Sequence, residues 1–170
     1  MYPLFITAIG AVFFPYQAAG SIIFKDGEPV GSELLAQKFT SDRYFHPRPS
    51  SVDFNPVPSG GSNLGPIDLR LKNLTDERYA EFIEKNILPR VANVPPEMLT
   101  ASGSGVDPHI TIESALLQAR RVAIARNFEP EMINKLTNLI FEIEETDNGK
   151  IFGLKKINVL KLNLALDQLY

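Results

Sequence analysis

The sequence has 170 residues, 44% of them hydrophobic and 22% charged, which is the balance of one globular domain and excludes a disordered or collagen-like chain. With no cysteine and only two histidines, His46 and His109, it has neither a disulfide scaffold nor a thiolate nucleophile, and we expect no metal site. The net charge of −3 argues against nucleic acid as a partner, because phosphate-binding surfaces need an excess of lysine and arginine.

The N-terminal segment is apolar, and its first charged side chain is Lys25. The run at 4–14 is about half of the roughly 20 apolar residues that span a membrane. Three interpretations are open: a buried first element, a signal peptide, and the exit half of a truncated membrane helix. We favour the third, because Phe13, Phe14 and Tyr16 cluster where the run ends, as interfacial aromatic residues do.

The chain is accordingly predicted to have two parts. Residues 1–18 are the remnant of a single N-terminal transmembrane helix, and residues 19–170 are a soluble domain. Because the N-terminal segment is too apolar for a protein surface and too short to cross a bilayer, we expect it to be the most exposed apolar stretch of the protein, or to pair with another copy of the chain in a crystal.

The first half of the soluble domain alternates short elements with loops. Five prolines and three glycines between positions 46 and 66 leave no room for a regular element there. In chain order we expect a hairpin at 21–30, a short helix at 32–39 capped by Ser32, a loop at 46–66, an amphipathic helix at 75–88 capped by Thr75, and one helical turn at 95–99.

The second half is richer in helix. We expect a helix from a cap at Thr111 to about 127, a second helix that begins at Pro130, a turn at 147–149, and a well-buried last helix from a cap at Asn158 to 169. Arg120, Arg121 and Arg126 fall mostly off the apolar stripe of the first of these helices. The fold class is therefore α+β or α/β: a mixed sheet packed with helices, with a helix-rich C-terminal half.

Two glycine-rich loops are candidates for a binding site. In residues 59–66, small side chains leave backbone N–H groups that can form an anion-binding nest, and the alternative is a tight, buried turn. A P-loop is excluded, because no lysine occurs between Lys38 and Lys72. We expect this loop and residues 101–108 to lie close together, each supporting the other beside a helix N-terminus, since both have backbone donors to satisfy.

A small hydrolase with Ser104 and His109 as nucleophile and base is one alternative for the second loop. The spacing of its glycines does not match the G-x-S-x-G motif, so a hinge followed by the entry to a helix is the simpler interpretation.

The segment at 44–50 combines aromatic, proline and arginine residues. Phe45 and Arg48 are candidate partner-binding anchors, because aromatic and arginine side chains dominate interface energetics. Equally, Phe45 can fill the core while Arg48 ties down carbonyl groups inside this chain. In the first case, truncating either side chain impairs assembly more than folding.

Six motifs together resemble one family. They are G-S-E-L-L-A-Q-K-F (31–39), Y-F-H-P-R-P-S (44–50), F-N-P-V-P-S-G-G-S-N-L-G-P (54–66), V-P-P-E-M-L-T-A-S-G-S-G-V-D-P-H-I (94–110), Q-A-R-R-V-A-I-A-R (118–126) and I-N-V-L-K-L-N-L-A-L-D (157–167). In order and spacing along the whole chain they are similar to the C subunit of the bacterial and archaeal Kdp potassium-transporting P-type ATPase.

The resemblance implies a non-catalytic accessory subunit of a high-affinity potassium uptake complex, and not an enzyme by itself. Its partners would be the ATP-hydrolysing subunit and the channel-like subunit. The family's subunit is described as a catalytic chaperone that promotes ATP binding by the ATPase subunit, or stabilises the complex. No cofactor is bound tightly, and ATP would be shared with the ATPase subunit. The residues implied to contact nucleotide are Gln37, Ser59, Gly60, Gly61, Ser62 and Asn63.

The resemblance also implies a location: the cell membrane, crossed once, with the soluble domain outside the cytoplasm. A domain placed there does not meet cytoplasmic ATP, so a contact with the channel-like subunit that steadies assembly or potassium entry suits this topology better. A soluble nucleotide-binding module is the alternative in which the domain binds ATP by itself.

Overall fold

The computed structural model describes residues 1–146 and 155–169. Its helices and strands follow one another as α1 Tyr2–Phe13, α2 Pro15–Ala18, β1 Ile22–Lys25, β2 Glu28–Ser32, α3 Leu69–Lys85, a 3₁₀ turn at Pro96–Met98, β3 His109–Thr111, α4 Ile112–Ala125, α5 Pro130–Glu142, β4 Glu145–Thr146, β5 Lys155–Asn158 and α6 Val159–Leu166. All described strand pairs are antiparallel. The fold is therefore α+β, and the strands form two small sheets rather than the single mixed sheet that we expected.

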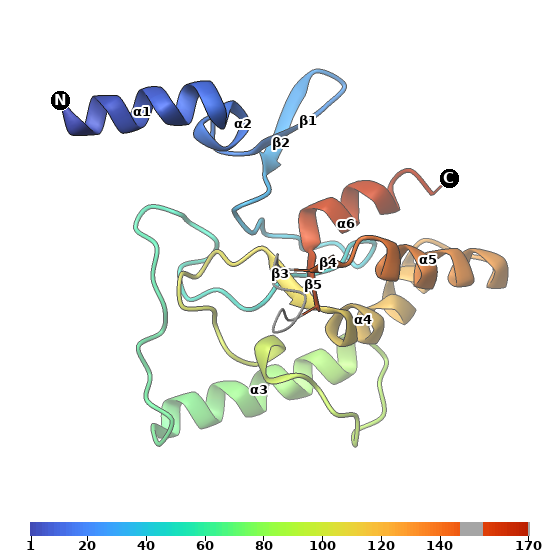
Figure 1. Ribbon diagram of the computed structural model, residues 1–170. Coiled ribbons are helices and arrows are strands. Elements are labelled where there is room, and N and C mark those ends of the chain that lie inside the picture. The colour runs from blue at the N-terminus through green and yellow to red at the C-terminus, as the bar shows by residue number, and fades with distance from the viewer. Residues whose placement is uncertain (147–154, 170) are drawn as a thin grey trace.

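The N-terminal helices and the hairpin lie at one end of the molecule, away from α3 at the opposite end (Figure 1). Strands β1 and β2 pair as the predicted hairpin. Its turn residues Asp26 and Gly27 have φ values of 55° and 85°. Two successive positive φ angles match the twist of the flanking strands, which is why Asp-Gly suits this position.

Helix α1 buries none of its side chains, although it is strongly apolar. Leu4, Val12 and Phe13 are each at least 70% exposed, and Phe14 and Tyr16 beyond the helix are exposed too. The predicted exposure of this segment is therefore confirmed. Among the described residues, no helix combines the length and apolar character that crossing a membrane requires. The interpretation of 1–18 as a membrane-helix remnant stays a prediction.

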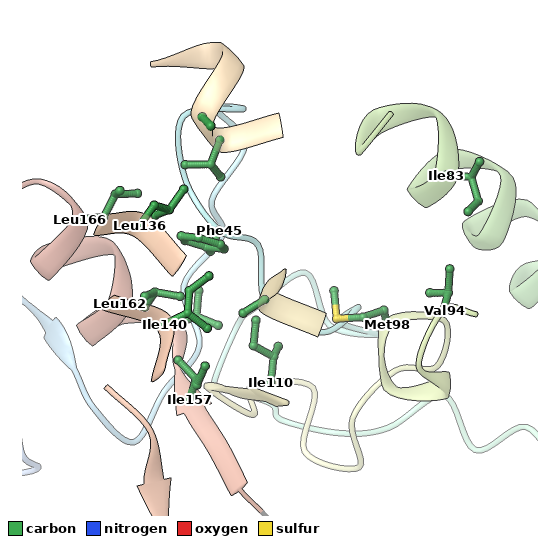
Figure 2. Packing of buried hydrophobic residues seen from close by; sticks show 14 residues of the cluster. Phe45, Ile83, Val94, Met98, Ile110, Leu136, Ile140, Ile157, Leu162 and Leu166 are labelled. Carbon is green, nitrogen blue, oxygen red and sulfur yellow. The ribbon is translucent and has the colours of Figure 1, made fainter. Parts of the chain in front are cut away.

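The core forms where α4, α5 and α6 pack around the three-stranded sheet, whose strand order is β3-β5-β4. Figure 2 shows Phe45 among side chains of α5 and α6, with Ile110 and Ile157 of the sheet nearby. Met98, Val94 and Ile83 extend the same cluster toward α3. Most side chains of α6 are buried, as predicted.

Three of the predicted helix starts are confirmed. Thr111 and Asn158 accept hydrogen bonds from the backbone N–H groups of Ser114 and Lys161, and Pro130 occupies the first position of α5. The expected turn at 147–149 lies outside the described residues.

Two predicted helices need correction. Residues 32–39 do not form a helix, because Ala36 N–H donates to the distant carbonyl of Val106 instead of to one four residues earlier. The Gln37 side chain holds the segment to Val30 as well. The helix expected at 75–88 is α3, which starts earlier: the Asp68 carboxylate accepts from Arg70 N–H and caps it. Thr75 lies inside α3, where its hydroxyl donates to the carbonyl of Lys72.

Candidate functional site

The two glycine-rich loops meet directly. Gly60 N–H donates to the carbonyl of Ser104 at 2.9 Å, and a Cβ on Gly61 would lie 3.1 Å from the carbonyl oxygen of Gly103. A side chain at Gly61 or at Gly105 would crowd this approach, whereas a Cβ on Gly103 would meet nothing within 4 Å. The predicted contact between 59–66 and 101–108 is therefore confirmed.

Each of these loops also contacts a helix N-terminus, but the two helices differ. The carbonyl of Gly65 accepts from the N–H of Asp68, the cap of α3. The carbonyl of Pro108 accepts from the N–H of Val159, the first residue of α6. The loops therefore join the ends of two helices rather than framing one.

The candidate nucleotide residues are held by different partners. Gln37 Nε2 donates to Val30 at 2.7 Å, and a Cβ on Gly31 would overlap that nitrogen, so Gln37 anchors the hairpin. The N–H of Gly60 is committed to Ser104 and is not free for an anion nest. Ser59, Ser62 and Asn63 are exposed at the surface, so the turn is tight but only partly buried. A nucleotide role for these residues stays a prediction.

The segment around Phe45 is held by side chains that imitate a neighbouring strand. Asn163 accepts from the N–H of Phe45 at 2.8 Å and donates to its carbonyl at 3.0 Å. Gln118 does the same for His46, at 2.8 and 3.1 Å. Each amide side chain thus satisfies both backbone groups of one residue that lies away from any sheet.

Two buried arginines complete this arrangement. Arg121 donates to the carbonyls of Asp42 and Tyr44 at 2.7 and 2.9 Å. Arg126 donates to the carbonyl of Arg43 at 2.8 Å and pairs with Asp167 at 2.7 Å.

Sequence reasoning missed the burial of these arginines by placing them off the apolar stripe of α4. Ser114, Gln118 and Arg121, all buried, follow one another at spacings of four and three residues. That spacing keeps side chains on one helical face. A polar row at this periodicity, next to the apolar stripe, is the signal that could have identified Arg121; Arg126, at the C-cap of α4, lies off this row.

Phe45 and Arg48 are both engaged within the chain. Phe45 is 0% exposed and belongs to the core, as the second interpretation of this segment proposed. Arg48 Nη1 pairs with Asp107 Oδ2 at 3.0 Å, so it ties down a carboxylate rather than carbonyls. These internal contacts do not test whether Phe45 and Arg48 also bind a partner, so that role stays a prediction.

Charged groups continue from Asp107 through His109 to α6. The His109 ring lies 3.4 Å from Asp107 and 3.3 Å from Glu145, and Lys161 bridges Glu145 and Glu33 at 2.8 and 2.7 Å. Partial burial raises the pKa of Glu145, but hydrogen bonding from Lys161 and His109 outweighs it and leaves the pKa below its usual value. This row of charges links β3, β4 and α6.

The Ser104 hydroxyl accepts from Val106 N–H, while the ring nitrogens of His109 face two carboxylates. The contacts of these two residues therefore give no nucleophile–base pair, and the hydrolase alternative loses its geometric basis. Within 1–146 and 155–169, no three side chains gather as metal ligands.

These features define a class of protein before any comparison is made. An α+β domain carries an N-terminal helix that leaves an apolar surface uncovered. Such a surface marks a chain that makes contacts with other molecules.

Comparison with known proteins identifies the family. The profile described as "KdpC: K+-transporting ATPase, c chain" matches residues 1–168. A potassium-transporting ATPase KdpC subunit from Caldanaerobacter subterraneus is 43% identical over 98% of this chain and 84% of its own length. KdpC subunits from Mycobacterium bovis and Rhodopseudomonas palustris are each 42% identical, over 99% and 98% of this chain and 89% and 87% of their own lengths.

The chain belongs to the KdpC family, which confirms the resemblance carried by its motifs. It is accordingly a non-catalytic accessory subunit of a potassium-transporting ATPase complex and has partner subunits.

The loop junction can be tested at Gly105. Its φ of 74° is unfavourable for a side chain, and a Cβ would lie 2.7 Å from the carbonyl oxygen of Gly60. Gly105→Ala should lower the free energy of unfolding by about 2 kcal/mol or more. The matched control is Gly65→Ala, where a Cβ meets nothing within 4 Å and the change should stay within about 0.5 kcal/mol. Equal denaturant midpoints for both variants would contradict this account of the junction.

The pH dependence of stability can be tested at His46. Burial, reinforced by the charge of Arg121, lowers the pKa of His46 to about 4 from 6.5. Because the unfolded chain binds this proton more readily, stability is complete above pH 6.5 and falls as the pH drops toward 4, by about 3 kcal/mol in all. We expect the His46 ring to titrate near pH 4 in NMR spectra and His46→Gln to flatten the stability profile between these pH values. A ring that titrates near 6.5 would refute the assignment.

Proposed function

We propose that this chain stabilises an ATP-driven potassium uptake complex by joining its partner subunits at the membrane. The observation that carries the proposal is helix α1, which is apolar and buries none of its residues. An uncovered apolar helix is unfavourable in water and marks a surface for lipid or protein.

The length of α1 suggests how it would act. Its 12 residues extend about 18 Å at 1.5 Å per residue, against about 30 Å for the hydrocarbon core of a bilayer. We therefore place α1 in the cell membrane beside apolar helices of its partners. The α+β domain then lies at the outer surface, where it contacts the channel-like subunit.

Promotion of ATP binding by the ATPase subunit is the second candidate function. The exposure of Ser59, Ser62 and Asn63 favours it, since their hydroxyl and amide groups are accessible to a ligand. The commitment of Gly60 N–H and Gln37 Nε2 to internal bonds favours the stabilising role instead.

The stabilising role predicts a specific loss of assembly. Replacing Leu4, Val12 and Phe13 together with serine should reduce co-purification with the other subunits about tenfold or more, because it removes apolar contact area. The melting temperature should not change, since these side chains contribute nothing to the core.

The matched control replaces Val57, Ile67 and Val91 with serine. These three are as exposed as the α1 residues but lie elsewhere on the surface. Full assembly of the α1 variant, or equal loss in both variants, would contradict the proposal.

The nucleotide role predicts a different change. If the chain promotes ATP binding through residues 59–63, the double variant Ser59→Ala, Ser62→Ala should raise the KM of the complex for ATP about tenfold while assembly stays intact. An unchanged KM in the assembled complex would rule out this role for the two serines and leave the stabilising role standing.

A further inference from the structure

A cavity of about 270 Å³ lies between α3 and the loop that follows Phe45. One wall comes from α3, another from residues 46–54, and the floor from α4 and the 3₁₀ turn. The lining includes Phe39, Pro47, Phe54, Phe82 and Met98 on the apolar side. Figure 2 shows Met98 on the side of the core that faces α3.

The charged groups at this cavity are mostly positive. Arg48, Arg78 and Lys85 line it together with the carboxylate of Glu81, on a chain whose net charge is −3. Outside the lining, Asp107 pairs with Arg48 at 3.0 Å and Asp42 lies 3.8 Å from Lys85, which leaves Arg78 without a carboxylate partner among the described residues. The low pKa of His46, also in the lining, agrees with this: the charges of Arg121 and Lys85 add to burial in disfavouring its protonation. An anion in the cavity would therefore meet a favourable field.

Arg48 also lines the cavity, and its Nη1 pairs with Asp107. Its Nε is shielded from solvent and has no acceptor among the described residues, so a ligand in the cavity would pair with the terminal guanidinium nitrogens instead. Arg78 uses Nη1 for the carbonyl of Leu99, which holds its guanidinium at the cavity wall.

We propose that this cavity binds a small organic anion, with its carboxylate between Arg48, Arg78 and Lys85 and a flat apolar body against Phe39, Phe54 and Phe82. The planar guanidinium of arginine can donate two parallel hydrogen bonds to a carboxylate, and aromatic side chains pack well against a flat apolar group. The volume is just below the range of drug-sized sites, which limits the ligand to about one ring with its side group. The proposal goes beyond the assembly role and does not rest on it.

The test titrates the full chain, held in mild detergent, with phenylacetate and separately with its neutral counterpart 2-phenylethanol. The side-chain amides of Asn86 and Gln118 line the cavity and report binding in ¹H–¹⁵N spectra. We expect saturable shifts with phenylacetate and at least about tenfold weaker binding of the alcohol. Partition into detergent or onto α1 would favour the alcohol, so it would give the opposite order.

Matched variants on α3 locate the site. Arg78→Ala and Lys85→Gln should each weaken phenylacetate binding about tenfold. Arg70→Ala and Lys72→Gln remove the same charges from exposed positions of the same helix and should leave binding unchanged. The absence of saturable shifts in the folded wild-type chain, or equal weakening by both pairs of variants, would overturn the proposal.

Discussion

The fold depends on how the irregular stretch 42–46, centred on the buried Phe45, satisfies its backbone hydrogen bonds. Phe45 lies in the core, and the stretch has no neighbouring strand to pair with. Buried N–H and carbonyl groups without partners would cost about 1–3 kcal/mol each. Side chains of α4 and α6 supply the partners instead, which ties the two helices to one segment of the first half.

A buried arginine is unusual, but here its charge and its donors are both satisfied. Burial lowers the pKa of Arg121 to about 10, so the side chain stays protonated at neutral pH. Its charge is balanced mainly by carbonyl dipoles, with Asp42 more than 3.5 Å away, and its planar fork serves several acceptors at once. An apolar residue of similar size would leave those carbonyls unpaired. The same stretch then runs through His46 and Pro47 to Arg48, so this network also positions one wall of the cavity.

Local rules explain which parts of the fold could be predicted from the sequence. The hairpin follows from Asp26-Gly27, and the starts of α4, α5 and α6 follow from Thr111, Pro130 and Asn158, because a cap or turn depends on neighbouring residues. Residues 32–39 could not be predicted in this way, since the carbonyl that accepts from Ala36 belongs to Val106. The contact between the glycine loops was predictable because both had backbone donors to satisfy, whereas the distinct partners of Gln37 and Gly60 were not.

The hydrogen bonds that side chains of 118–126 and of α6 make to residues 42–46 also show what the family motifs report. The motifs at 44–50 and 118–126 supply two sides of this network: His46 exchanges two backbone hydrogen bonds with the Gln118 amide, and the carbonyl of Tyr44 accepts one from Arg121. Much of the resemblance that identifies the family is thus carried by residues that hold the domain together. Because those side chains are already committed, they identify the complex without marking the surface that joins it. The proposed assembly surface lies instead on groups that the fold leaves uncovered, and α1 is a strongly apolar helix of this kind among the described residues.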